Sequence, residues 1–538
     1  MTTTHNSGNS PSGAAATNAS AAGSGANGAG NTSATSSNLG ANSPANPNRA
    51  GKPNTGLFRT KSVEQSISET HEEGFRLKRE LRTIDLIVFG VSVVIGAGIF
   101  TMTAQVAGDM AGPSVAIAFL LAAVTCGLAA LCYAEFASTV PVAGSAYTFS
   151  FATFGELIAW IIGWDLVLEF FVAAAVVSKA WSSYVSGLFG SDDFTLFHVG
   201  GLTIDWGAAL LVVVLGLLLA RGTKLSSRVS MVITAIKLGV VLLVIVVGAF
   251  YIKLDNYKPF IPSKQHTPTG SGEGLKQTLF SWITGSEGSA FGVFGIFAAA
   301  SLVFFAFVGF DVVASAAEET RNPQKSLPRG ILGTLAIVTV LYVAVALVLT
   351  GMVKYTDLAT PAEGHSHTLA TAFEANGITW AGAIINIGAI AGLTTVVMVM
   401  MLGQTRVAFA MSRDGLLPRG LAKTSKFGTP SRITAITTAA VAILSALAPS
   451  GDLGEMVNIG TLFAFLLVAL GIPVLRKRHP GSAAFKTPFV PVVPILSALF
   501  SLWLMANLSI ETWIRFIVWM ALGFALYFLY SRKHSVLA

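Results

Sequence analysis

Ionisable residues lie inside several long apolar stretches of this chain. Lys237 lies within one stretch, Asp165 and Glu169 lie four residues apart in another, and Asp311 lies in a third. Residues four apart share a helix face, so the two acids of one stretch would point the same way. Because an isolated charge is costly in an apolar environment, such groups pair with each other, bind protons or bind a charged ligand.

Each of these groups has a functional and a structural interpretation. We expect Lys237 to be a fixed or titrating cation that couples proton movement; the alternative is a lysine that snorkels or pairs with an acid. Glu169 is expected to receive a proton or the cationic side chain of a ligand, and Asp165 is a second candidate; one of the two could instead neutralise Lys237. Asp311 follows a glycine and would either cap a helix N-terminus or bind a proton.

Glycine interrupts two apolar stretches near their centres. The first reads Ile95-Gly96-Ala97-Gly98-Ile99, and the second runs from Phe304 to Asp311 with Gly309 inside it. Glycine in a membrane helix often serves close helix packing. The alternative is a discontinuous helix, whose freed amides attract an anion and whose freed carbonyls attract a cation.

The composition requires a membrane. Hydrophobic residues make up 53% of the chain and charged residues 11%, whereas a soluble domain has about 25% charged residues. The apolar runs are continuous and long enough for helices that span a bilayer. We therefore predict an all-α membrane protein with twelve transmembrane helices, near residues 84–107, 114–137, 145–189, 206–222, 226–252, 291–317, 329–353, 378–412, 430–449, 453–475, 489–509 and 512–531.

Basic residues orient these helices. With the N-terminus in the cytoplasm, 26 of the 34 lysines and arginines fall in cytoplasmic segments and five in external loops. Since cytoplasmic loops carry the excess of basic residues, both termini are predicted to be cytoplasmic. The scattered basic residues give no nucleic-acid surface, although the net charge is +7.

The chain divides into five predicted parts. Residues 1–55 form a low-complexity tail with no charged residue before Arg49, which predicts disorder. A basic cytoplasmic segment follows at 56–83. Residues 84–475 form a ten-helix transport core, 476–531 hold the last two membrane helices, and 532–538 are a cytoplasmic C-terminus.

The two interruptions fall in helices 1 and 6, which begin two halves of five helices each. Interruptions at corresponding positions of two halves indicate a transporter binding site, and an odd number of helices per half makes the repeats inverted. Each break offers amides for an anion and carbonyls for a cation. A zwitterionic α-amino acid matches both, so it is the predicted substrate.

Seven motifs, taken together and in order, resemble the amino acid–polyamine–organocation superfamily and, within it, the cationic amino acid transporter family. The resemblance covers about residues 75–531. The motifs are Ile95-Gly96-Ala97-Gly98-Ile99-Phe100, Tyr133-Ala134-Glu135, Gly144-Ser145-Ala146-Tyr147, Gly163-Trp164-Asp165 with Glu169, Phe305-Ala306-Phe307-Val308-Gly309-Phe310-Asp311, Glu318-Glu319-Thr320-Arg321-Asn322-Pro323, and Arg406 through Ala410-Met411-Ser412-Arg413-Asp414-Gly415.

The resemblance implies an inverted-repeat fold that works by alternating access. It implies that the backbone at Ile95, Gly96, Ala97 and Gly98 holds the substrate carboxylate, and that the backbone at Phe305, Ala306, Phe307 and Val308 holds the amine and forms a gate. Lys237 resembles the helix 5 lysine that replaces a sodium ion in proton-coupled members. Glu169, Leu393 and Thr394 would line the side-chain pocket. Many relatives carry Ser or Thr in place of Ala97, so a hydroxyl contact to the carboxylate is absent here.

The predicted function is therefore secondary active, proton-coupled uptake of an L-α-amino acid across the plasma (inner) membrane. Sodium-coupled or exchange-type transport of an amino acid or polyamine, and a transporter-like sensor, are the alternatives. The sequence predicts no cofactor, metal site or enzyme activity, because it has no cluster of nucleophiles or metal ligands. The expected partners are the amino acid, the proton and the lipid bilayer, while a small membrane subunit or a homo-oligomer remains open.

Overall fold

The computed structural model describes eleven stretches of the chain and is mainly helical within them. The predicted tail, nearly all of the basic segment before helix 1 and the Glu318-Glu319 pair lie outside these stretches. The described residues are 81–139, 145–190, 194–199, 202–222, 227–266, 274–285, 289–316, 320–360, 367–425, 428–478 and 484–536.

Helices occupy all twelve predicted ranges. In the first half of the chain they are α2 Thr83–Val94, η1 Gly98–Met102, α3 Thr103–Val106, η2 Ala107–Ala111, η3 Gly112–Ser114, α4 Val115–Thr139, α5 Ser145–Thr153, α6 Glu156–Leu188, α7 Trp206–Ala220 and α8 Ser227–Ala249. Short helices η4 Leu254–Tyr257, η5 Gly274–Lys276 and α9 Leu279–Thr284 follow.

The second half continues the same pattern. It contains α10 Gly292–Val303, η6 Phe304–Phe307, α11 Val312–Ser315, α12 Pro323–Met352, η8 Tyr355–Leu358, α13 Leu369–Ala375, α14 Thr379–Arg413, η9 Arg419–Ala422, α15 Ser431–Leu447, α16 Ser450–Arg478, α17 Val492–Ala506, α18 Ile510–Leu526, η10 Tyr527–Ser531 and α19 Arg532–His534. Across the described residues, eight helical stretches are long and apolar enough to cross a membrane, and four shorter apolar helices accompany them.

Strands are few and short in the described part of the chain. The hairpin of β1 (Leu196–Val199) and β2 (Leu202–Asp205) precedes α7, and β3 (Gln265–His266) pairs antiparallel with β4 (Ser289–Ala290) before α10. The side chain of Asp205 accepts a hydrogen bond from the Ala208 amide and so caps α7. Both strand pairs lie between membrane helices, and Ala290 of β4 packs in a small buried cluster with Phe291 and Tyr355.

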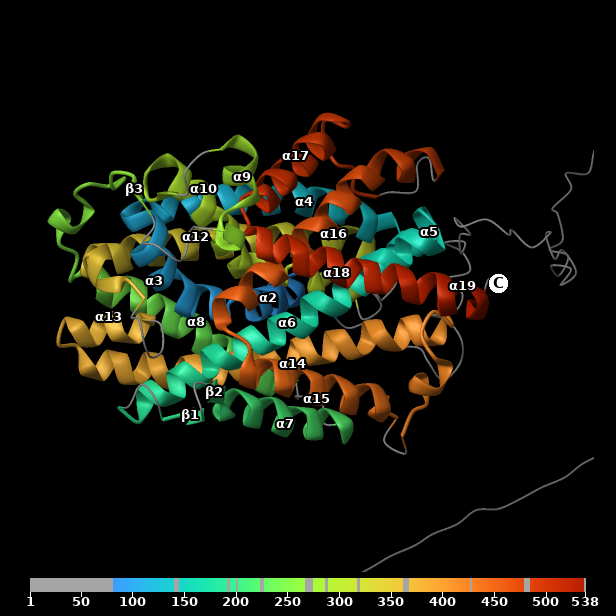
Figure 1. Ribbon diagram of the computed structural model, residues 1–538, viewed down its shortest axis with the longest axis horizontal. Helices are drawn as coiled ribbons and strands as arrows, with labels where there is room; N and C mark the ends of the chain where they lie inside the picture. The colour runs from blue at the N-terminus through green and yellow to red at the C-terminus, as the bar shows by residue number, and fades with distance from the viewer. Residues whose placement is uncertain are drawn as a thin grey trace, which may run out of the picture. The chain divides into compact units, whose positions relative to one another are not determined.

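The helices pack in two groups around α2 and α10. Helix α6 runs across α14, and α7 lies beside α15 on the same side of the bundle (Figure 1). On the other side, α16 packs against α17 and α18, while α12 packs against α4 and α2. Nearly all buried apolar side chains belong to one core cluster, which surrounds the interrupted helices.

Both predicted interruptions are present. Helix α2 ends at Val94, and Ile95 takes an extended conformation (φ −69°, ψ 95°) before helical structure resumes at Gly98. The second interruption follows η6, where Val308 is extended and Gly309 has φ +107°. A residue with a side chain rarely adopts that φ, so glycine is needed at position 309.

The long third predicted segment is divided as expected. A short lead-in helix, α5, ends before Gly155, which has φ +101°, and α6 then continues for 33 residues. The lead-in and the long helix therefore have different directions, which a single straight span of 145–189 could not have.

Candidate functional site

The two interruptions contact each other. A Cβ atom placed on Gly98 would collide with the backbone and Cβ of Ala306, so only glycine allows this approach. The structure thus brings together the two glycine-containing breaks, which are more than 200 residues apart in the sequence. Gly96 lies on another side of the first break, where an added Cβ would be 3.5 Å from Val396 of α14.

Lys237 binds the carbonyl end of α2. It is fully buried, and its ammonium donates to the carbonyl oxygens of Ser92 (2.6 Å) and Ile95 (3.2 Å). The C-terminal end of a helix carries a partial negative charge, which stabilises a cation there. Lys237 makes no ion pair with an acid among the described residues, so the predicted alternative of a neutralising Asp or Glu is not seen.

Two further side chains that the sequence reasoning missed bind backbone at the breaks. The Tyr342 hydroxyl donates to the carbonyl of Val94 at 2.7 Å, and the Asn458 amide donates to the carbonyls of Ser301 (2.8 Å) and Leu302 (3.3 Å). Both residues are buried. Their signal in the sequence was a polar side chain in an otherwise apolar run. Carbonyls released by an interruption are satisfied in this way.

The predicted carboxylate-binding residues are all buried at the first break. Ala97 is 1% exposed, and its carbonyl accepts the Thr101 hydroxyl at 2.7 Å. Gly96 lies outside the regular helices, and its amide donates to no backbone carbonyl of a described residue. A donor without a partner at this place fits a site for an anionic group.

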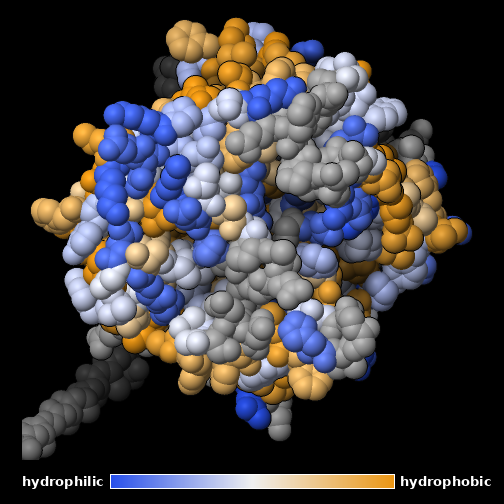
Figure 2. All heavy atoms as spheres, turned by 60° about the vertical axis from the view of Figure 1, so that its left-hand side comes forward, coloured by the Kyte–Doolittle hydropathy of each residue, from blue (hydrophilic) through white to orange (hydrophobic). Residues whose placement is uncertain are grey.

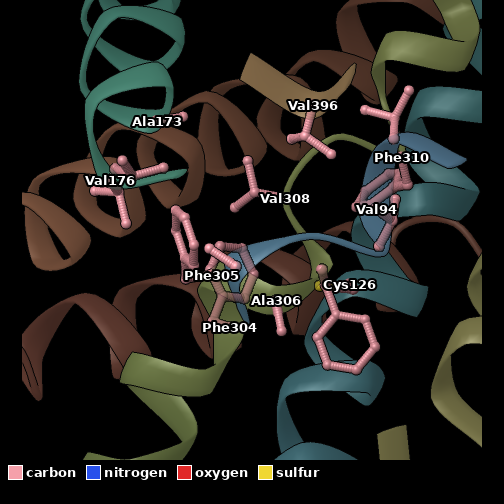
Figure 3. Packing of buried hydrophobic residues seen from close by; sticks show 14 of the residues in the cluster. Val94, Cys126, Ala173, Val176, Phe304, Phe305, Ala306, Val308, Phe310 and Val396 are labelled. Atoms are coloured by element: carbon pink, nitrogen blue, oxygen red, sulfur yellow. The ribbon is translucent and has the colours of Figure 1, made fainter. Parts of the chain in front are cut away.

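The aromatic residues of η6 divide into two sets. Phe307 packs edge-on against Tyr342 and Phe119 and is fully buried. Phe305 instead points toward Val176 of α6, and its carbonyl accepts the Val308 amide at 3.2 Å (Figure 3). Of the two gate candidates, only Phe305 faces α6.

Apolar side chains surround the second break on the side of α6 and α14. Figure 3 shows Val308 between Ala173 of α6 and Val396 of α14, with Val176 next to Phe305. Ala173, Val176 and Val396 were not among the predicted site residues, because an aliphatic side chain in a membrane helix carries no distinguishing signal. Leu393 is fully buried in the core, and the Thr394 hydroxyl bonds the Ile390 carbonyl of its own helix at 2.7 Å.

The three predicted acids form a buried cluster next to the second break. Glu169 lies close enough to Asp311 and Asp165 for electrostatic interaction with both. The Tyr133 hydroxyl also interacts electrostatically with all three acids. Both oxygens of Asp165, one oxygen each of Glu169 and Asp311, and the Tyr133 hydroxyl are buried without a hydrogen-bond partner. Asp311 is the N-cap residue of α11. We name Asp165, Glu169, Asp311 and Tyr133 the acid cluster.

Two of the motif residues make contacts at the predicted cytoplasmic end. Glu135 of α4 is 1% exposed and accepts two hydrogen bonds from the Arg476 guanidinium, at 2.8 and 2.9 Å, and a third from the Thr487 amide. The Tyr147 hydroxyl of α5 donates to Asp414, just after α14, at 2.7 Å. The Glu135 carboxylate is therefore buried and paired with the partly exposed Arg476 guanidinium.

Two interrupted helices that meet inside a bundle of apolar helices are the architecture of a secondary transporter. The profile of the amino acid permease family matches residues 81–526, and the chain belongs to this family. It is a multi-pass membrane protein, as predicted, and the prediction of an amino acid–polyamine–organocation superfamily permease is confirmed.

Curated relatives carry several substrate names. The chain is 43% identical to the branched-chain amino acid permease BcaP of Bacillus subtilis over 89% of this chain and 99% of the relative. It is 41% identical to the methylthioribose transporter of the same organism, over 90% and 99% of the two chains. It is 34% identical to the chloroplastic cationic amino acid transporter 9 of Arabidopsis thaliana, over 89% and 93%. These relatives are transporters and not enzymes.

Proposed function

We propose that the protein is a secondary active transporter that couples proton movement to uptake of an L-α-amino acid by alternating access. The contact between the two breaks at Gly98 and Ala306 carries this proposal. It places the free amides of the first break beside the free carbonyls of the second break. The amides can bind the carboxylate of a zwitterion, and the carbonyls can bind its ammonium group.

The proposed fold has twelve transmembrane helices, ten of which form two inverted repeats of five. The helices found at all twelve predicted ranges support the count, and the breaks in the first helix of each half support the repeat. The distribution of basic residues supports an orientation with both termini in the cytoplasm. The proposed location is the plasma membrane.

In the proposed complex, the backbone from Ile95 to Gly98 holds the carboxylate. The carbonyls from Phe305 to Val308 hold the amine, with the Phe305 ring as the gate on the side of α6. Among the described residues, the carbonyl oxygens of Phe307 and Val308 accept no backbone hydrogen bond outside the helices, so they are available to an ammonium group.

Lys237 is the proposed coupling residue. Its two carbonyl acceptors belong to the break that would bind the carboxylate, so loss of its proton would release the end of α2. The acid cluster is a second place where protons are held. Buried carboxylates that have no cationic partner are too costly to keep ionised in an apolar region, so protons must neutralise most of them.

We further propose that the transported side chain is neutral and aliphatic. Ala173, Val176, Val308 and Val396 offer apolar surface beside the break. The name of the Bacillus subtilis permease at 43% identity agrees with this class. Glu169 would then bind a proton. The alternative is that Glu169 lines the pocket for the substrate side chain.

Transport by the purified protein in liposomes tests the proposal. An inward proton gradient should drive accumulation of labelled L-leucine, and unlabelled valine and isoleucine should compete better than lysine, arginine or methylthioribose. Accumulation that needs sodium would favour sodium coupling, and uptake only against preloaded amino acid would favour exchange. Failure to move any of these solutes would favour a transporter-like sensor.

A further inference from the structure

A polar cavity opens at the end of the bundle that the basic residues predict to be external. Its volume is about 590 Å³, within the range of small-molecule sites. Its walls come from the outer ends of α6, α12 and α14, from α13 and from the loop around η8. Figure 2 shows hydrophilic residues gathered on the face that includes this end, with hydrophobic residues around its edge.

The cavity is separate from the two breaks. Gly187 in its wall follows Val176 of α6 by eleven residues, about 16 Å along a helix. Asn386 in its wall precedes Val396 of α14 by ten residues, about 15 Å. Both helices therefore pass from the candidate site to the cavity over the same distance.

Tyr184 lies on α6 between the candidate site and the cavity. It is fully buried on α6, between Val176 and Gly187, and its hydroxyl donates to the Phe100 carbonyl at 2.7 Å. Its ring also packs edge-on against Phe100, with centroids 6.0 Å apart. Thr368, which lines the cavity, lies within hydrogen-bonding reach of the same hydroxyl. Along α6, the contact with Phe100 of η1 therefore lies between Val176 and the cavity wall at Gly187.

The lining offers partners for both charges of a zwitterion. Lys253 and Lys354 are cationic, and Asp357 and Glu374 are anionic. Among the described residues, Lys253 and Lys354 take part in no ion pair, so an ammonium group is available to a carboxylate. Met352, Val353 and Leu358 add apolar surface for a side chain.

Asn386 provides a built polar contact. It is 4% exposed and lines the cavity. Its carboxamide makes no hydrogen bond with another described residue, so both its donor and its acceptor are available to water or to a polar ligand in the cavity.

We propose that this cavity is a second binding subsite, which holds a zwitterionic amino acid outside the Tyr184–Phe100 contact before the amino acid reaches the breaks. The inference rests on the proposed amino acid transport. It adds a place where the substrate is captured from the external solution, with Lys354 and Asn386 as the residues that bind it.

Cysteine labelling tests the subsite without requiring transport. Cys126 and Cys132 are fully buried, so Ser183→Cys in the cavity wall would be the accessible thiol for a water-soluble methanethiosulfonate reagent. L-Leucine should slow labelling of Ser183→Cys several-fold. Ala359→Cys, which is exposed at the same end but does not line the cavity, should label at the same rate with and without leucine.

Two added substitutions distinguish the subsite from an indirect effect. Asn386→Leu or Lys354→Met should abolish protection at Ser183→Cys and raise the KM for leucine influx several-fold, while the KM for efflux and kcat stay unchanged. Lys354 is exposed, so its substitution does not threaten folding. Protection that is absent, or equal in all variants, would overturn the subsite. Protection without transport by the wild type would support the subsite and refute the proposed function.

Discussion

At the scale of single residues, the chemistry depends on one buried lysine and on groups that have no counterion. Within the described part of the chain, Lys237 is held by two carbonyls of the interrupted helix and by no carboxylate, so backbone dipoles balance its charge there. Removing a proton from this group would therefore change the interaction between α8 and helix 1 directly. This makes Lys237 the residue through which a proton can affect the shape of the carboxylate site.

The substitution Lys237→Met should abolish the pH dependence of uptake and lower proton-driven accumulation about tenfold or more, because it removes the charged hydrogen bonds to the Ser92 and Ile95 carbonyls, and one such bond contributes about 1.5–3 kcal/mol. Methionine keeps an unbranched apolar chain of similar length, so the fold should persist. Initial rates of leucine uptake in liposomes between pH 5 and 8 measure the effect.

Lys179→Met is the matched control. Lys179 also lies in a membrane helix, but its partners do not belong to the breaks. Its ammonium donates to the Ser445 carbonyl at 3.0 Å and lies 3.6 Å from Asp205. Its loss should alter stability and leave the pH profile intact. An unchanged pH profile in Lys237→Met would remove Lys237 from the coupling mechanism.

At the scale of secondary-structure elements, glycines on α14 set how closely it approaches α8. Gly388 and Gly392 are one turn apart and face Val240 and Lys237, respectively. A Cβ on Gly392 would lie 2.8 Å from Cγ, 2.9 Å from Cε and 3.2 Å from Cδ of Lys237. The absence of that atom leaves room for the lysine stem to pass along α14 toward the Ser92 carbonyl.

Gly392→Ala should therefore displace the Lys237 ammonium, reduce proton-driven uptake about tenfold and shift its pH profile, with little loss of thermal stability. In Gly403→Ala, on the same helix, the added Cβ meets Phe170 at 3.4–3.6 Å, which is ordinary contact, so uptake should stay near the wild-type rate. Parallel pH–rate profiles of the two variants measure the difference.

A second comparison separates packing from coupling. If Gly392→Ala acts through Lys237, it should add little to the defect of Lys237→Met, because residues in contact are not additive. Additive effects, or a Gly392→Ala profile identical to the wild type, would mean that the helix contact has no part in positioning the lysine.

The elements themselves were largely predictable from the sequence. Long apolar runs gave the ranges of the helices, and the glycines at 96, 98 and 309 gave the positions of both breaks. The side chains that contact the breaks from neighbouring helices were not predictable. Examples are Tyr342, Asn458 and Val396. Helices that are apolar on every side have no periodic pattern to show which face meets which neighbour.

At the scale of the whole molecule, the ion pair of Glu135 and Arg476 connects distant parts of the chain. Glu135 on α4 binds Arg476 at the end of α16 and the amide of Thr487, and the Arg476 guanidinium donates to the Thr487 carbonyl at 2.8 Å. These contacts connect the second helix of the bundle with the tenth and with the segment that leads to α17. They lie at the predicted cytoplasmic end.

Glu135→Gln should lower the apparent Tm of the detergent-solubilised protein. A hydrogen bond to a charged group contributes about 1.5–3 kcal/mol, and the partial exposure of Arg476 reduces what is lost because water can solvate the guanidinium. The Arg476→Gln variant should be similarly less stable. The double variant should lose less than the sum of the two, since each single change leaves one partner without its counterpart. Thermal unfolding of the wild type, the two single variants and the double variant completes the double-mutant cycle. Strictly additive changes in Tm would show that the Glu135–Arg476 pair does not stabilise the contact between α4 and α16.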